Sequence, residues 1–592
     1  MSIAQELQKA VIATLSNLYG TDFTETDFQV NQTKEDFEGD YTVVLFSLLK
    51  KTGKSPAALG EELGNALIQA HPHLFTGFNI IKGFLNLDVA ERFWLKILND
   101  NYANPDYGVL PDNGKKVMVE YSSPNTNKPL HLGHLRNNFL GWSVAEILKA
   151  NGNKVFKSCI VNDRGIHICK SMIAWQLFGD GATPQSTGKK GDHFVGDYYV
   201  KFNDEYKLQV QELVTGGMPA AEAEKQAPIM LATQQMLFDW EASKPEVMEL
   251  WRKMNGWVYE GFDVTYQKIG SDFDKIYYES NTYLLGKKTV EEGLAKAVFE
   301  QEADSSVWID LTADGLDRKI VQRKDGTSVY ITQDIGLAQQ KYQEYGIDQS
   351  IYVIGDEQNY HMKVLKLIAE KLQLPNAENI YHLSYGMVEL PTGKMKSREG
   401  TVVDADELVD EMIATARRHT EELGKVKDFE ASELDALFNT LGLGAMKFYL
   451  LRVDPKKKMI FNPEESIDFH GFTGPFVQYT YARIKSILRK ENPAADIQTT
   501  GALFLKLEKE IVIALEQFST ILAQAARELN PSVIAIYIFN LAKSFNSFYT
   551  IHSIANAETP EKKLLRLQLA VMTANVLRKG MGLLGIEVPE RM

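Results

Sequence analysis

Two histidines near residue 130 have the type and spacing to bind a phosphate. They lie in the stretch VEYSSPNTNKPLHLGH as His131 and His134, with Gly133 between them. The pattern predicts a buried strand over 117–121 and a helix over 132–151, which places both imidazoles on the first helical turn. A helix N-terminus offers free N–H groups and a partial positive charge, and Gly133 has no side chain to keep a flat base away. We therefore predict a nucleoside triphosphate site at the carboxyl end of this strand.

A second segment carries the cations that such a site needs. Residues 386–400 read GMVELPTGKMKSREG and include Lys394, Lys396 and Arg398. A glycine-bounded loop of this kind can close over a triphosphate and neutralise the charge of departing pyrophosphate. Alone, it would more often be a solvated turn, and the histidine pair alone could bind a metal or stay solvated. A metal would need a third ligand nearby, whereas the next residues supply Arg136, a cation suited to phosphate. The two segments together favour the functional interpretation.

A parallel sheet must hold these segments in place. A βαβ unit is predicted over 117–161. Further strand signals lie at 307–311, 328–332 and 350–355. A polar, mostly helical stretch over about 180–290 interrupts them. We predict a Rossmann-type α/β domain over 113–440 that contains this insertion and the basic loop over 393–400.

Two further domains flank the α/β domain. Residues 1–112 mix helical and strand patterns and end in a turn-rich stretch, which predicts a small α+β domain. Its expected elements are helices over 3–19 and 56–70 and strands over 41–48 and 79–87. Over 441–592 the strand signals vanish and a 3.6-residue period dominates, which predicts an all-α bundle.

Composition narrows the class of protein. The 592 residues are 44% hydrophobic and 24% charged, which excludes a disulfide-stapled scaffold and a disordered chain. Two cysteines, an N-terminus without a basic region and no uninterrupted apolar run of 18 residues predict a cytoplasmic protein with no membrane span. The net charge of −14 is uneven, since residues 441–592 carry 19 basic and 14 acidic side chains, or +5, and residues 1–440 carry −19. The helical third is therefore compatible with a polyanionic partner.

The two catalytic segments resemble a known family. HLGH and KMKSR are similar to the HIGH and KMSKS signatures of class I aminoacyl-tRNA synthetases. Longer stretches resemble the arginyl-tRNA synthetases in particular, and the resemblance runs from residue 36 to residue 592. These stretches are VEYSSPNTNKPLHLGHLRNN, DGTSVYITQDIGLA, TGPFVQYTYARIKSILRK and GIEVPERM.

The resemblance implies a set of catalytic and ATP-binding residues. They are Lys128, His131, Gly133, His134, Lys394, Met395, Lys396 and Ser397. The chain departs from the general signature, because Ser397 occupies the place of its second lysine and Lys396 comes one position earlier. In the family a lysine just before HIGH is thought to compensate, and Lys128 occupies that place. Which of the three lysines contributes most stays open.

The resemblance also implies an arginine-binding set. It comprises Glu120, Ser122, Asn125, Tyr330, Asp334 and Gln358. Glu120 would meet the ammonium group of arginine and Asn125 its backbone groups. Tyr330 and Asp334, one helical turn apart, would bind the guanidinium, which prefers carboxylates in a fork geometry. Alternatively, Glu120 is a surface acid at a strand end and Asp334 opposes a helix dipole.

A third implied set contacts RNA. The predicted tRNA-binding residues are Phe84, Asn86, Tyr479, Tyr481, Arg483, Tyr549 and Met592. The aromatic and cationic members in the helical third suit stacking on splayed bases. By resemblance, Met592 lies against the anticodon loop, and Phe84 and Asn86 touch the tRNA elbow. We expect Phe476 and Phe548 to pack in the core instead.

The resemblance implies an arginine–tRNA ligase. Its substrates would be arginine, ATP with Mg²⁺ and no dedicated protein metal site, and tRNA(Arg), which is bound before arginine is activated. We expect a monomer. The rivals are another class I synthetase, a small HxGH nucleotidyltransferase, which would not need the helical third, and a catalytically inactive relative, which should have lost one of the histidines or loop cations.

Overall fold

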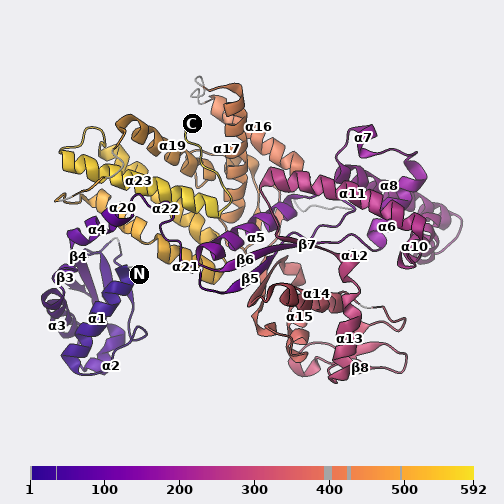
Figure 1. The fold of residues 1–592 in the computed structure, drawn as a ribbon, viewed down its shortest axis with the longest axis horizontal. Helices are drawn as coiled ribbons and strands as arrows, with labels where there is room; N and C mark the ends of the chain where they lie inside the picture. The colour runs from indigo at the N-terminus through magenta and orange to yellow at the C-terminus, as the bar shows by residue number, and fades with distance from the viewer. Residues whose placement is uncertain are drawn as a thin grey trace.

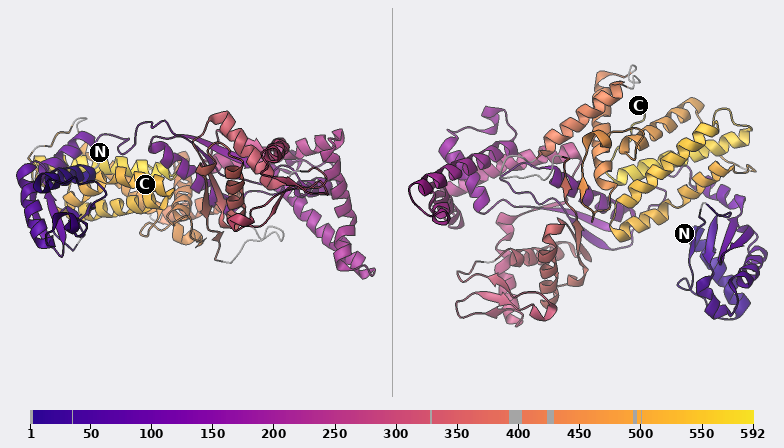
Figure 2. Two further views of the ribbon diagram at one scale, coloured as in Figure 1. Left: turned by 90° about the horizontal axis from the view of Figure 1, so that it is seen from below. Right: turned by 180° about the vertical axis from the view of Figure 1, so that it is seen from behind.

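The computed structural model places the predicted domains along an elongated molecule. It describes residues 3–34, 36–327, 329–391, 403–422, 429–493, 497–499 and 501–592. In Figure 1 the small N-terminal domain lies beside the C-terminal helices, the central sheet occupies the middle, and the helical insertion extends to the opposite end. The two further views in Figure 2 show the same order along the long axis.

The N-terminal domain is α+β, as predicted. Its elements are α1 (Ile3–Tyr19), β1 (Val30–Gln32), β2 (Tyr41–Val44), η1 (Phe46–Leu48), α2 (Leu49–Thr52), α3 (Pro56–Ala70), β3 (Phe75–Ile81), β4 (Phe84–Val89) and α4 (Glu91–Asn101). The strands form an antiparallel sheet in the order β1-β2-β4-β3. The single strand predicted over 79–87 is wrong. Lys82 and Gly83 both have positive φ, at 50° and 83°, and they turn the chain into a hairpin.

The central sheet has five parallel strands. Its strands are β5 (Lys116–Glu120), β6 (Lys154–Val161), β7 (Lys275–Tyr278), β11 (Gln349–Gly355) and β12 (Ile380–Tyr385), and α5 (Leu132–Ala150) connects β5 to β6. The strand order is β12-β11-β5-β6-β7, with Ile351 opposite Val119 across the β11–β5 pair. The chain leaves β5 toward β6 and returns on the other side of β5 as β11. The carboxyl end of β5 is thus the topological switch point, where open α/β sheets bind ligands.

The insertion is helical, but it ends earlier than the predicted range. It contains α6 (Ile166–Phe178), α7 (Pro184–Thr187), α8 (Gly191–Thr215), α9 (Ala220–Gln226), α10 (Pro228–Glu241) and α11 (Pro245–Ile269). β7 lies within the predicted range of about 180–290 yet pairs with β6 in the central sheet. This four-residue strand is too short to give a distinct sequence pattern.

Most of the chain from β7 to β13 forms a lobe, seen at the bottom of Figure 1, whereas β11 and β12 from this stretch belong to the central sheet. It includes α12 (Glu279–Thr282), α13 (Leu285–Ala295), β8 (Glu300–Gln301), β9 (Val307–Ile309), η2 (Thr312–Asp314), β10 (Lys319–Gln322), α14 (Tyr330–Tyr345), η3 (Asp356–Gln358), α15 (Asn359–Lys371), η4 (Ala377–Asn379) and β13 (Val388–Glu389). β9 joins an antiparallel sheet with β8 and β10, not the central sheet as predicted. The strand predicted over 328–332 is also wrong, since a helix begins at Tyr330. Burial of Ile331 and Ile335, four residues apart, outweighs the local β propensity.

The C-terminal third is helical, with one two-residue strand that the sequence did not reveal. Its elements are α16 (Ala405–Glu422), α17 (Ala431–Leu451), β14 (Met459–Ile460), α18 (Pro463–Ser466), α19 (Gly474–Glu491), α20 (Lys506–Glu516), α21 (Phe518–Glu528), α22 (Ser532–Ile551) and α23 (Pro560–Leu583). β14 pairs with β13. Phe548 is fully buried and Phe476 packs against the core, as expected. Among the described residues, no helix combines the length and apolarity needed to cross a membrane.

Candidate active site

The two histidines lie at the start of α5, as the sequence predicts. His131 is the N-cap, and its Nδ1 accepts a hydrogen bond from the Gly133 N–H at 3.1 Å. His134 Nδ1 accepts one from the His131 N–H at 3.2 Å, which completes a reciprocal capping box. The ring centroids are 3.9 Å apart. The helix thus begins by using both imidazoles to satisfy its own free N–H groups.

These contacts fix the form of each imidazole. Because each Nδ1 accepts a backbone N–H, each neutral ring carries its proton on Nε2. Burial lowers the pKa of His131 to about 4, with a smaller contribution from nearby Lys128. Burial likewise lowers the pKa of His134 well below its usual value, and lowers that of Lys128. Near pH 7 both rings are therefore neutral Nε2–H donors, which suits them to hydrogen-bond anionic oxygens.

Arg136 does not supply the phosphate-binding cation that the sequence predicts. Its side chain is 2% exposed and donates to four main-chain carbonyls. Nη1 bonds Gly386 O at 2.6 Å and Met387 O at 3.2 Å, while Nη2 bonds Pro455 O at 3.3 Å and Lys457 O at 2.8 Å. Arg136 therefore ties α5 to the segment that leads into the predicted basic loop and to a turn after α17.

Ser122 is placed differently from the prediction. It has φ +62°, and its side chain is fully buried. Its Oγ shares a 2.7 Å hydrogen bond with the Tyr266 hydroxyl and accepts from Asn138 Nδ2 at 3.2 Å. Its N–H donates to Asn137 Oδ1 at 2.6 Å. The left-handed turn at the strand end thus points the hydroxyl into the protein, where it anchors β5 to α5 and is not placed to contact arginine.

Glu120 is neither a surface acid nor an unpaired one. The residue is 6% exposed, and its carboxylate contacts the ammonium of Lys341 on α14. Burial alone would lower the pKa of Lys341, but the charges of Glu120 and the Tyr352 hydroxyl outweigh it and raise the pKa. The predicted partner of the arginine ammonium therefore already has a buried counterion, and Lys341 is a residue that sequence reasoning missed.

Tyr330 begins α14 and Asp334 lies one helical turn further on, as the resemblance implies. Tyr330 is 69% exposed and lines a cavity of about 780 Å³ that also contains Arg164 and Glu279. Asp334 Oδ2 lies 2.7 Å from His361 Nε2. His361 is therefore a partner of Asp334 that the sequence did not reveal, although it comes only three residues after Gln358.

Asn125 and Gln358 are both exposed. Asn125 forms an isolated bridge with Asn162 beyond β5, and Gln358 ends the short helix η3 after β11. Both therefore lie at carboxyl ends of neighbouring strands in the central sheet, which is the edge where the site is predicted.

The signature positions of the basic loop lie outside the described residues. These are Lys394, Met395, Lys396 and Ser397. The chain that follows them is held next to the histidines, since Leu132 N–H donates to Val403 O at 3.3 Å and Ala405 N–H donates to Leu130 O at 3.0 Å. Residues 403–405 therefore lie beside the first catalytic segment, although more than 250 residues separate the two in the sequence.

Comparison with known proteins decides the family. Residues 99–462 match the family described as tRNA synthetases class I (R), catalytic domain, 477–592 match the DALR anticodon binding domain, and 5–89 match the arginyl tRNA synthetase N terminal domain. The arginine–tRNA ligases of Bacteroides fragilis and Flavobacterium psychrophilum are 52% and 51% identical, with both chains covered completely. The chain belongs to the arginyl-tRNA synthetase family. The fold agrees, with a TM-score of 0.79 to Thermus thermophilus arginyl-tRNA synthetase at 24% identity over both full chains.

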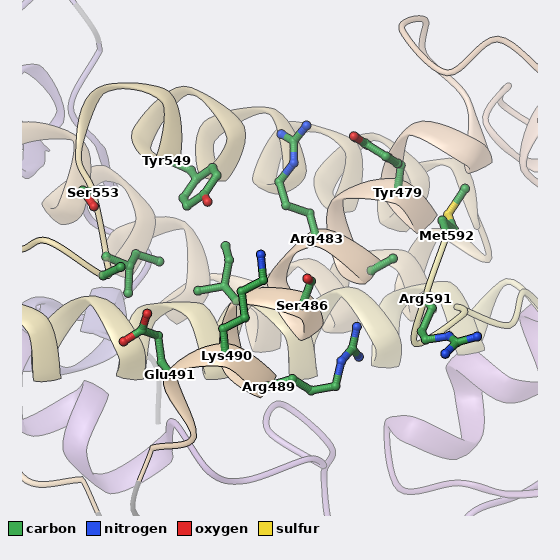
Figure 3. Close-up of a pocket in the computed structure, with 14 residues that line it drawn as sticks. Tyr479, Arg483, Ser486, Arg489, Lys490, Glu491, Tyr549, Ser553, Arg591 and Met592 are labelled. Carbon is green, nitrogen blue, oxygen red and sulfur yellow. The ribbon is translucent and has the colours of Figure 1, made fainter. Parts of the chain in front are cut away.

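The part of the chain that matches the synthetase anticodon domain has a basic hollow. A cavity of about 420 Å³ lies between α19, α22 and the C-terminus. Its lining includes Tyr479, Arg483, Tyr549 and Met592. In Figure 3, Arg483 lies between the two tyrosines, and its guanidinium is 4.8 Å from the Tyr479 ring centroid. Four residues of the predicted tRNA-binding set of this synthetase thus gather at one surface.

Tyr481 does not fit the predicted stacking role. Its ring is 2% exposed, and its hydroxyl donates to Glu590 at 3.0 Å. On α19, Tyr479 and Tyr481 are two residues apart and so point to different faces of the helix. Tyr479 faces the hollow, and Tyr481 faces the core of the bundle.

The two N-terminal residues predicted to contact tRNA, Phe84 and Asn86, also differ in where their side chains lie. Asn86 is fully buried in the sheet, where its Oδ1 accepts from Thr42 Oγ1 at 2.7 Å and its Nδ2 donates to Asn79 Oδ1 at 2.8 Å. Its side chain is therefore not placed to contact tRNA. Phe84 is half-buried at the hairpin and packs edge-to-face on the exposed Phe46, with centroids 5.8 Å apart. Phe84 stays a candidate for tRNA contact.

Proposed function

We propose that the chain joins arginine to tRNA(Arg) in two steps at the carboxyl edge of the central sheet. The arginine carboxylate attacks the α-phosphate of ATP, and the bond to pyrophosphate breaks. The 2′-hydroxyl of the terminal tRNA ribose then attacks the arginyl-adenylate carbonyl and releases AMP. No side chain acts as a nucleophile, so positioning and charge stabilisation supply the acceleration.

Neutral His131 and His134 donate their Nε2–H groups to ATP phosphate oxygens in this proposal. Gly133 leaves room for the adenine. Lys128, Lys394 and Lys396 balance the charge that develops on pyrophosphate, with Met395 and Ser397 beside the nucleotide. Mg²⁺ accompanies ATP, held by phosphate oxygens and water. The observation that carries the proposal is the pair of neutral imidazoles that cap α5 at the switch point of the sheet.

Asp334 defines the amino-acid specificity. Its carboxylate binds the guanidinium in a fork geometry, beside Tyr330 and Gln358. Glu120 and Asn125 meet the ammonium and backbone groups of arginine. The hollow lined by Tyr479, Arg483, Tyr549 and Met592 holds anticodon bases by stacking and charge, with Phe84 at the elbow of the tRNA.

Three properties complete the proposal. The protein acts as a monomer in the cytoplasm, and it activates arginine only after tRNA has bound. Analytical ultracentrifugation with and without tRNA tests the first, and comparison of exchange rates with and without tRNA tests the last.

The deciding experiment is ATP–pyrophosphate exchange with each amino acid, with and without total tRNA. Arginine-dependent exchange is the expected result. Exchange driven by glutamate or cysteine but not by arginine would overturn the assignment, as would exchange with a substrate that is not an amino acid. Loss of exchange in His134→Ala with retained arginine binding separates the role of the nucleotide site from that of the amino-acid site.

A further inference from the structure

The helical insertion reaches the catalytic segment through a cluster of opposite charges. Lys190 and His193 lie at the start of α8 in the insertion. Asp404 and Asp406 lie at the start of α16, directly after the segment that carries the second signature. The cluster therefore joins the insertion to the chain that leaves this signature.

The contacts in the cluster are short and partly buried. Lys190 Nζ contacts Asp406 Oδ2 and donates to Thr265 Oγ1 at 2.6 Å. His193 Nε2 lies 3.0 Å from Asp404 Oδ2 and 3.4 Å from Asp406 Oδ2. The side chains of Lys190 and Asp406 are 20% and 14% exposed. Water therefore screens these pairs less than it screens surface salt bridges.

His193 and Asp406 are both charged near neutral pH. The nearby carboxylates of Asp404 and Asp406 raise the pKa of His193 to about 10. Burial alone would raise the pKa of Asp406, but the nearby cations His193 and Lys190 outweigh it and lower the pKa. The insertion therefore presents two cations to two carboxylates.

A metal ion is the obvious alternative occupant. Ligand atoms of Asp192, His193 and Asp406 lie within 4.8 Å of one another. The Lys190 ammonium, however, contacts both carboxylates, at 3.0 Å from Asp192 Oδ2 and closer to Asp406. The chain thus supplies its own cation at this place.

The cluster adjoins the first signature. Asp404 forms an isolated antiparallel bridge with His131, the cap of α5. His193 and Asp404 line a cavity of about 230 Å³ together with Lys128 and His131. A shift of Asp404 would therefore move backbone that is bonded to the catalytic histidine segment.

We propose that Lys190 and His193 are positioning residues for amino-acid activation, through which the insertion holds Val403–Asp406 against the HLGH segment. This inference rests on the proposed function. The two signatures act on one ATP molecule, so their separation must be fixed closely. A misplacement of about 1 Å can cost about 100-fold in rate. In this proposal the insertion contributes to the rate of amino-acid activation and does not only enlarge the surface of the protein.

The test uses His193→Gln and Lys190→Met in the full chain. Arginine-dependent ATP–pyrophosphate exchange is measured with tRNA present, and rates are normalised to active sites titrated by adenylate formation. We expect kcat to fall at least about tenfold in each variant, while the KM for arginine changes by less than about twofold. Lys190→Arg should restore most of kcat, because it keeps a cation opposite Asp406.

A matched control is Lys244→Met. Lys244 is an exposed cation of the same insertion, 2.8 Å from Asp239 Oδ1 and remote from α16 in sequence and structure. The kcat of the Lys244→Met variant should equal that of the wild type. Asp406→Asn combined with Lys190→Met should lose no more than either single variant, because the two residues act through one contact.

The outcomes separate this inference from the proposed function. If the wild type shows no arginine-dependent exchange, the proposed function fails. If the wild type is active and the variants keep their kcat per titrated site, the positioning role is wrong, and the cluster only stabilises the fold. Equal losses in Lys244→Met and Lys190→Met would also overturn it.

Discussion

Lys341→Met tests whether the buried counterion of Glu120 matters for arginine binding. The side chains of Lys341 and Glu120 are 1% and 8% exposed, and the ammonium lies 4.6 Å from the Tyr352 ring centroid. Removing one partner of such a pair leaves an uncompensated charge in a site that excludes water, which costs about 3–5 kcal/mol. Without Lys341 no counterion holds the Glu120 carboxylate in place, and the arginine ammonium would lose its positioned carboxylate partner.

Two assays measure these effects separately. At about 1.4 kcal/mol per tenfold, this loss of stability corresponds to roughly hundred- to few-thousand-fold faster hydrogen exchange of the backbone amides in β5. In ATP–pyrophosphate exchange, we expect the KM for arginine to rise at least about tenfold and the KM for ATP to stay within about twofold. Lys341→Arg should keep both properties near those of the wild type, because it retains the charge.

The double variant Lys341→Met with Glu120→Gln controls for the loss of the lysine alone. It removes both charges, so its amide exchange should be slower than that of Lys341→Met, since no buried charge is left unpaired. Its KM for arginine should stay high, because Glu120 is gone. The reasoning is refuted if Lys341→Met leaves both the β5 exchange rate and the arginine KM within about threefold of the wild type.

Three further predictions follow from single contacts. Asp334→Asn should raise the KM for arginine far more than that for ATP in pyrophosphate exchange, and equal losses would contradict the guanidinium role. Tyr549→Ala should raise the KM for tRNA by about 5- to 150-fold in aminoacylation, from about 1–3 kcal/mol per stacked base, whereas buried Tyr481→Phe should leave it unchanged. Between pH 6.5 and about 4 the unfolded chain binds protons at His131 that the folded chain does not, so the thermal midpoint should fall as the pH falls through this window, and an unchanged midpoint would contradict the low pKa.

Local signals were sufficient for the elements that are long and periodic. The helix that begins after His131 and the helical third were predictable, because capping residues and hydrophobic spacing act over a few residues. The start of α14 was not, since Tyr330 and Ile331 favour a strand locally and only burial against the lobe makes them helical. The four-residue β7 likewise depends on its neighbour β6 for its existence as a strand.

The roles of polar residues depended on partners that no local pattern reveals. Arg136 follows the two histidines of the predicted nucleotide site, so the sequence predicts that its charge binds phosphate, yet its acceptors come from residues 250 and more positions later in the chain. The lysine beside Glu120 is 221 residues away. In both cases a motif does not distinguish the residues predicted to touch a substrate from the residues that hold them in place.

This distinction explains why the residues around HLGH are polar although they are buried. Arg136 and Asn137 donate to main-chain carbonyls around α5, such as Val353 O at 2.7 Å from Asn137 Nδ2, whereas Asn138 donates to Ser122 Oγ and accepts from Ser271 Oγ. Parallel strands end at this edge with unpaired backbone groups, and buried groups of this kind must find partners. Polar side chains on α5 satisfy them and, in the same contacts, set the position of the two histidines. An apolar substitution here would therefore change the geometry of the site as well as the stability of the sheet edge.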